Sequence, residues 1–289
     1  MPPFWTSIAV LSFVQGVLVA LPGTIALPRV QRLRARRWAL IPPLSVIGFV
    51  LAARAAEHAS AQGLTYLALC AVPVLAALAL GWMLWRPRPR WALLVGPMFA
   101  LAWLDRNGLA GEAAALALSA LSCVALGVLL ASITPPRWLA AGVVAMAVAD
   151  SALVISHLLQ GPNDALNAAH PAAGLPQLQS AVFGNAVMGY GDLFIAGALG
   201  GLLAATVGRS LQLRAARLTA ALALLFDLLF FVVEELPATV PVACALIVVA
   251  LTRRREASPR RPRARVAAPI ASVGVPAARP VAARRSPSR

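Results

Sequence analysis

Nine long apolar runs, separated by short polar connections, constrain the fold of this chain more than any other feature. Most contain about 17 to 25 residues, enough for a helix to cross the roughly 30 Å hydrocarbon layer of a bilayer. With 60% hydrophobic and 12% charged residues, the 289-residue chain is far less polar than a soluble globular protein. The sequence therefore predicts an all-α, multi-pass membrane protein with nine transmembrane helices, near residues 5–27, 38–55, 64–85, 91–104, 109–132, 137–159, 183–208, 215–235 and 238–252.

The arginines predict how these helices are oriented. The odd-numbered connections carry Arg29, Arg32, Arg34, Arg36, Arg37, Arg86, Arg88, Arg90, Arg137, Arg209, Arg214 and Arg217. The even-numbered connections hold most of the acids and, of the arginines, Arg54 and Arg106. Because basic loops remain on the cytoplasmic side, the N-terminus is expected outside and the C-terminus in the cytoplasm.

The basic residues are assigned to topology and not to a nucleic-acid site. The net charge is +15, but the arginines fall between apolar runs and in the tail, without interleaved stacking aromatics. Residues 1–252 are expected to form the transmembrane domain, and the Arg/Pro-rich residues 253–289 a disordered cytoplasmic tail near anionic lipid. The use of arginine without lysine indicates a GC-rich, bacterial genome, and hence the bacterial plasma membrane.

The cysteines give no sign of a metal or cofactor site. Cys70, Cys123 and Cys244 all lie in apolar runs, without a CxxC pair or nearby histidines. We therefore expect free thiols and no metal or other cofactor.

Three acids lie within the predicted helices: Asp150, Asp192 and Asp227. Ionisable groups in a bilayer are costly, so each is a candidate functional residue. Asp150 lies about twelve residues, or about 18 Å, from the cytoplasmic end of its helix, and Asp192 about seventeen residues, or about 25 Å, from that of the next. These similar depths predict that two antiparallel neighbours bring both carboxyl groups together, whereas Asp227 is expected to bond a neighbouring helix or face a polar cavity.

Two adjacent carboxyl groups provide the chemistry for amide hydrolysis. They cannot both ionise cheaply, so one keeps a proton and the pair becomes an acid beside a base. The base would activate a water and the acid would bond the scissile carbonyl, giving a tetrahedral gem-diol. Gly189 and Gly191 fit this interpretation, because they would loosen the helix and let a substrate backbone approach Asp192.

The stretch LPATVP, residues 236–241, is predicted to be extended or irregular. Pro237 and Pro241 lack a backbone N–H and restrict the residue before them. Irregular backbone at membrane depth persists where it lines a cavity or is buried in protein.

Together these residues resemble the intramembrane aspartyl proteases of the presenilin and signal peptide peptidase family. Gly189-Tyr190-Gly191-Asp192 matches the family signature GxGD, Asp150 and Asp192 lie on predicted helices six and seven, and Pro237-Ala238-Thr239 stands where the family has Pro-Ala-Leu. The resemblance covers about residues 137–252, the span count and the signal peptide peptidase orientation.

This resemblance implies roles for individual residues. Asp150 and Asp192 would be catalytic, and Gly189, Tyr190, Gly191, Pro237, Ala238 and Thr239 would bind the substrate. The substrate would be a transmembrane protein or signal peptide that unwinds, in one interpretation by strand addition. The family usually has Tyr before its first aspartate, where this chain has Ala149, and Leu where it has Thr239. The resemblance does not identify the substrate, the oligomeric state or partner subunits.

Four alternatives remain open at this level. The acids could be structural, or could relay charge in a proton-coupled transporter or channel. Prepilin peptidases also use GxGD, but they follow it with lysine, where this chain has Leu193 and Phe194. The chain could also be an inactive relative that binds membrane proteins without cutting them.

Overall fold

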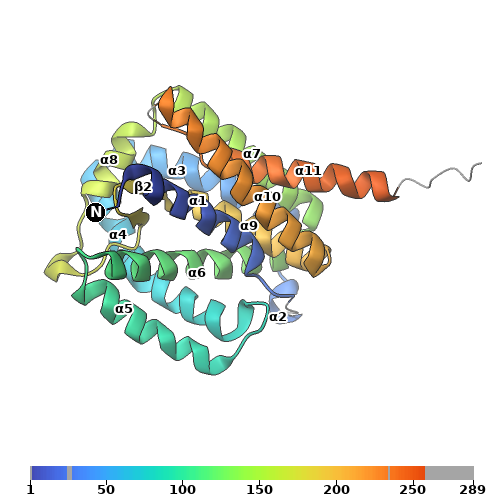
Figure 1. Ribbon diagram of the computed structural model, residues 1–289, viewed down its shortest axis with the longest axis horizontal. Coiled ribbons are helices and arrows are strands. Elements are labelled where there is room, and N and C mark those ends of the chain that lie inside the picture. Colours follow the sequence, from blue (N-terminus) through green and yellow to red (C-terminus); the bar gives the residue numbers. More distant parts are fainter. Residues whose placement is uncertain (1, 25–27, 234, 258–289) are drawn as a thin grey trace, which may run out of the picture.

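The computed structural model describes residues 2–24, 28–233 and 235–257. Of the disordered tail predicted for residues 253–289, residues 253–257 are helical and the rest lies outside the described residues. The described part is mostly helical (Figure 1). Its α-helices are α1 (Phe4–Ala20), α2 (Pro28–Gln31), α3 (Ile41–Ala55), α4 (Glu57–Leu78), α5 (Val95–Leu104), α6 (Leu109–Ile133), α7 (Pro136–Ile155), α8 (Gln160–Ala168), α9 (Tyr190–Thr206), α10 (Arg209–Asp227) and α11 (Val240–Ala257).

Shorter elements join these helices. They are the short 3-10 helices η1 (Arg36–Leu40), η3 (Pro89–Leu94), η4 (Ala172–Gly174) and η5 (Leu228–Phe231), the π-helical segment η2 (Ala79–Met83), and the strands β1 (Ser180–Phe183) and β2 (Ala186–Gly189). The 3-10 helices η1 and η3 lead directly into α3 and α5, and η2 extends α4, so they lengthen apolar helices.

The helices confirm the membrane character of the chain. Each of the nine predicted runs overlaps one of the longer α-helices described above. Within the described part of the chain, four helical stretches are long and apolar enough to cross a membrane, namely Arg36–Ala55, Ala59–Met83, Leu109–Ile133 and Pro136–Ile155. Phe4–Ala20, Pro89–Leu104 and Tyr190–Thr206 are apolar but shorter.

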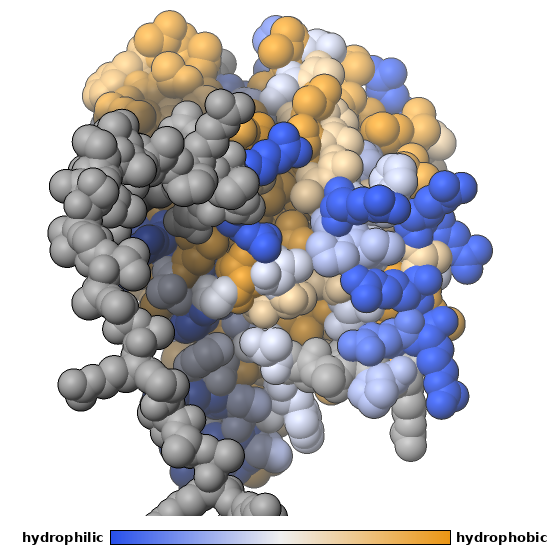
Figure 2. All heavy atoms as spheres, turned by 90° about the vertical axis from the view of Figure 1, so that its right-hand side faces the viewer, coloured by the Kyte–Doolittle hydropathy of each residue, from blue (hydrophilic) through white to orange (hydrophobic). Residues whose placement is uncertain are grey.

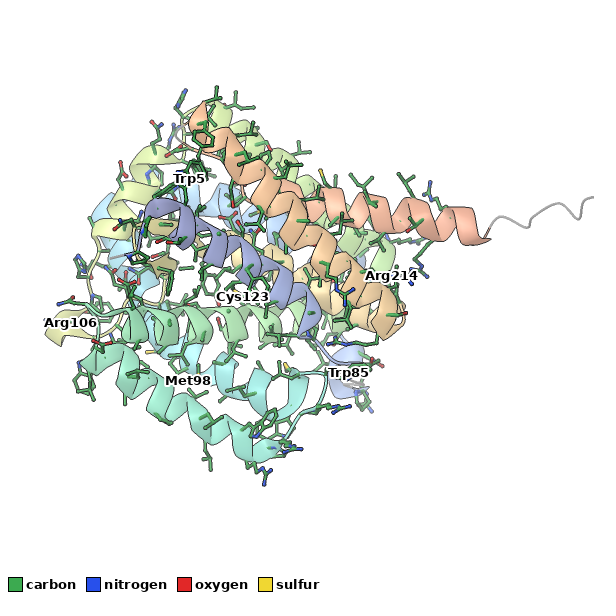
Figure 3. All side chains as sticks on the ribbon, in the orientation of Figure 1. Trp5, Trp85, Met98, Arg106, Cys123 and Arg214 are labelled. Carbon is green, nitrogen blue, oxygen red and sulfur yellow. The ribbon has the colours of Figure 1, made fainter. Side chains whose placement is uncertain are left out.

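The centre of the bundle is the crossing of α6 and α9. A Cβ atom at Gly197 of α9 would collide with the carbonyl oxygen of Cys123 on α6, and one at Gly127 would collide with the carbonyl oxygen of Gly197. A Cβ at Gly201 would lie 2.5 Å from the carbonyl oxygen of Gly127. Cys123 is labelled near the middle of the bundle in Figure 3. Small residues four apart on both helices therefore allow the close backbone contact that is common between membrane helices.

The helix α1 packs against the second half of the chain. It lies beside α10 and crosses α9 (Figure 1). A Cβ at Gly16 would lie 2.7 Å from the Cβ of Ala220 on α10, and one at Gly200 of α9 would lie 2.6 Å from the carbonyl oxygen of Leu18. The first helix is thus held between the two helices that follow the GxGD motif.

The predicted start of the seventh helix was wrong. The helix expected from residue 183 begins at Tyr190, and a β-hairpin precedes it, with Phe183 opposite Ala186. Gly184 has φ 58° and is the first of two loop residues, as in a type II′ turn. Glu112 Oε2 accepts a hydrogen bond from the N–H of Gly184 at 2.7 Å, which ties the hairpin to α6. A short apolar run does not distinguish a strand from a buried helix, which explains the error.

The two ends of the bundle differ in their side chains. Arg214 and Trp85 lie at one end, and Trp5 and Arg106 lie at the other (Figure 3). Figure 2 faces the first of these ends and shows hydrophilic residues gathered over part of it, beside hydrophobic surface.

Candidate aspartate pair between α7, α9 and α11

Asp150 lies in the second half of α7 and is buried, with 7% of its surface exposed. The Oγ1 hydroxyl of Thr239 donates a hydrogen bond to Oδ2 of Asp150 at 2.7 Å. Thr239 is itself fully buried and immediately precedes α11. The residue that stands in place of the family's leucine is therefore bonded directly to the first candidate aspartate.

Asp192 lies in the first turn of α9 and is partly buried. This position differs from the one predicted, because α9 begins at Tyr190 and Gly189 is the last residue of β2. The helix is not loosened at Gly189 but starts there. A helix N-terminus carries partial positive charge and unpaired N–H groups, so the start of α9 is a favourable place for a carboxylate.

The helices α7 and α9 meet beside both aspartates. A Cβ at Gly191 would lie 3.5 Å from the Cε atom of Met146, which is an ordinary contact. Met146 is one turn before Asp150 and on the same face of α7. The two residues thus lie on facing sides of neighbouring helices.

The segment before α11 lies against the same site. Residues 235–237 have no regular structure, and a turn at Ala238 and Thr239 leads into the helix at Val240. The irregular backbone predicted for residues 236–241 is therefore present up to Thr239, whereas Val240 and Pro241 already belong to the first turn of α11, where proline is tolerated. The side-chain Nε2 of Gln15, on α1, donates to the carbonyl oxygen of Ala238 at 3.0 Å. This segment therefore connects α1 with Asp150 of α7.

Tyr190 is turned toward another helix. Its hydroxyl lies 2.6 Å from Oγ of Ser122 on α6, within hydrogen-bonding distance. Of the residues expected to contact substrate, Gly189 and Gly191 lie beside Asp192, whereas the hydroxyl of Tyr190 fastens the start of α9 to α6.

Two polar residues of α1 were missed by sequence reasoning. Gln15 is 1% exposed, and its Oε1 atom has no hydrogen-bond partner among the described residues. Ser12 donates from Oγ to Oδ2 of Asp227 at 2.6 Å, so this third acid bonds a neighbouring helix, as expected. The signal was present in the sequence, because a glutamine inside the apolar run LSFVQGVLVA is costly without a partner.

The arrangement brings two carboxyl groups, a hydroxyl donor and irregular backbone to neighbouring positions on α7, α9 and the segment before α11. Such a group can hold a water molecule between two carboxyl groups and exchange a proton with it. In comparisons with models of protein families, with curated proteins and with solved structures, the chain matched none of them.

Proposed function

We propose that this chain is an intramembrane aspartyl protease of the presenilin and signal peptide peptidase type, which cuts transmembrane segments inside the bilayer. The observation that carries the proposal is the placing of Asp150 and Asp192 on facing sides of the neighbouring helices α7 and α9. The Thr239 segment beside Asp150 adds support, because it occupies the position of the family's proline motif.

The reaction follows from one ionised and one protonated carboxyl group. Two carboxyl groups in close proximity share a proton, because both cannot ionise cheaply. The ionised group takes a proton from water, the water oxygen adds to the amide carbon, and the protonated group gives its proton to the carbonyl oxygen. The gem-diol then collapses as the C–N bond breaks and the amide nitrogen receives a proton. An acid and an amine result, without a nucleophilic side chain.

The hairpin before Asp192 offers a place for an unwound substrate. In an antiparallel pair, alternate residues direct N–H and C=O groups away from the partner strand. Phe183 and Ala186 flank the two-residue loop and form a hydrogen-bonded pair. The backbone groups of β2 that point away from β1 are therefore those of Val187 and Gly189. Both are exposed, and β2 ends three residues before Asp192. An extended substrate strand on this edge would therefore bring an amide toward the aspartate pair.

The basic residues support nine spans, with the N-terminus outside. Four arginines lie over tryptophan rings, in the pairs Arg37–Trp38, Arg88–Trp91, Arg137–Trp138 and Arg209–Trp85. Each of these arginines belongs to a connection expected in the cytoplasm. Tryptophan is enriched at membrane interfaces and arginine on the cytoplasmic side, so these pairs mark one interface of the proposed protein.

A peptide-cleavage assay tests this function. The purified protein, reconstituted in liposomes, is incubated with a panel of transmembrane peptides in water enriched in ¹⁸O. We expect products cut within the apolar segment, each with one ¹⁸O atom in its new carboxyl group. The protease assignment would be abandoned if no member of a broad panel were cut.

An Asp227→Asn variant separates the protease from a charge relay. Asparagine still accepts the hydrogen bond from Ser12 but carries no exchangeable charge, so we expect peptide cleavage within about twofold of wild type. Proton flux across the liposome membrane is measured in parallel. A flux that depends on Asp227, in a protein that cuts no peptide, would support the transporter instead.

A further inference from the structure

The polar contacts of α1 reach the aspartate site through the segment before α11. Gln15 Nε2 donates to the Ala238 carbonyl at 3.0 Å, and the next residue, Thr239, donates to Asp150 Oδ2 at 2.7 Å. Gln15 is 1% exposed and Thr239 is fully buried, so water competes little for either bond. Two successive hydrogen bonds thus join the first helix to the first candidate catalytic group.

Thr239 fixes how the Asp150 carboxyl is turned. A threonine hydroxyl has one proton to donate, and in this structure Asp150 receives it. With Oδ2 held by this donor, the carboxyl plane has one preferred orientation, and Oδ1 is the oxygen that the hydroxyl does not occupy. Two carboxyl groups that act on one water require this kind of fixed geometry, because small misplacements lower the rate greatly.

Gln15 fixes the backbone from which Thr239 projects. Residues 235–237 lack the internal hydrogen bonds of a helix, so buried carbonyl groups nearby need other partners. Gln15 supplies one to Ala238, although its own Oε1 has no partner among the described residues. A buried polar atom without a partner costs free energy, so the unpaired Oε1 atom of Gln15 lowers the stability of the fold.

We propose that Gln15, the Ala238 carbonyl and Thr239 form a hydrogen-bonded relay that positions Asp150 for catalysis. Gln15 and Thr239 are then positioning residues, and Thr239 does not hold the substrate. This inference rests on the proposed protease function. It adds that α1, which lies outside the region of family resemblance, contributes to the site.

Substitutions at Thr239 test the first bond of the relay. A hydrogen bond to an ionised group contributes enough to change a rate about tenfold to hundredfold, so kcat should fall by that factor in Thr239→Val and in Thr239→Leu. Thr239→Ser keeps the hydroxyl and should retain most of kcat. KM should change by less than about twofold in all three variants. Full activity in Thr239→Leu, which restores the family's residue, would overturn the relay, and so would a change confined to KM.

Gln15 and Ser12 provide the matched comparison on α1. Gln15→Leu should lower kcat about tenfold in the wild-type background but change it little in Thr239→Val, because the relay is already broken there. Ser12→Ala removes a polar contact one turn away and should leave kcat unchanged. Equal losses in Ser12→Ala and Gln15→Leu, or losses that multiply independently, would show that α1 has only a general packing role.

Thermal unfolding tests the relay independently of the proposed function. If the wild-type protein cuts no peptide, the protease proposal falls, but the contacts can still be tested by a double-mutant cycle on the melting temperature. Coupled effects of Gln15→Leu and Thr239→Val would support the connection from α1 to Asp150. Strictly additive effects would overturn it.

Discussion

Replacing either aspartate by asparagine is expected to lower peptide cleavage roughly a thousandfold or more. Asparagine has nearly the size of aspartate but can neither take a proton from water nor give one to a carbonyl oxygen. In Asp150→Asn the amide oxygen can still accept the bond from Thr239, so the fold around α7 should persist. The measurement is kcat/KM on a peptide that the wild-type protein cuts.

A variant that carries both substitutions tests whether the two aspartates act together. Two groups that act on one water and one scissile bond behave as a unit, so Asp150→Asn/Asp192→Asn should be no slower than either single variant. Melting temperatures within a few degrees of wild type would exclude unfolding as the cause. Cleavage that survives in either single variant would contradict the catalytic assignment.

The second large effect is expected on stability, at the crossing of α6 and α9. Gly197→Val would place three carbon atoms against the backbone of α6, where even a Cβ collides with the Cys123 carbonyl. Overpacking a tight contact costs about 1–3 kcal/mol and more where backbones touch, so a loss of about ten degrees in melting temperature is expected. Cleavage should fall with it, because α9 carries Asp192.

A glycine in open space is the control for this substitution. Gly48 lies inside α3, and a Cβ there would have no neighbour within 4 Å. Gly48→Val should therefore change the melting temperature by only a few degrees. Equal losses at Gly48 and Gly197 would indicate a general cost of replacing helical glycines and would contradict the close crossing.

The sequence allowed the helical part of the fold to be predicted because membrane helices follow a length rule. A run of apolar residues in a membrane must satisfy its backbone hydrogen bonds internally, and each predicted run overlaps one of the longer helices described above. The similar depths counted for Asp150 and Asp192 predicted that they lie side by side on two neighbouring helices. The count assumed a helix from residue 183, whereas α9 begins at Tyr190 and Asp192 lies in its first turn.

Other features depend on tertiary contacts that no local pattern contains. The hairpin before Tyr190 is held by Glu112, which lies far away in the sequence. The bond from Thr239 to Asp150 joins residues on different helices, and the resemblance had assigned Thr239 to substrate binding. Gln15 was visible as a polar residue in an apolar run, but its partner, a backbone carbonyl at Ala238, has no sequence signature.

Cross-linking between positions 150 and 192 tests most directly whether one site contains both aspartates. Asp150→Cys and Asp192→Cys are combined in a chain without its native cysteines, with a protease site inserted in the connection between α8 and β1. A short bifunctional thiol reagent is added in the membrane, and the chain is then cut at that site.

We predict that the two halves stay joined in this variant. They should separate in the control that pairs Val148→Cys with Asp192→Cys, because Val148 is exposed on the other side of α7 at nearly the same depth. Halves that separate with cysteines at 150 and 192, or that join equally well from position 148, would contradict the shared aspartate site.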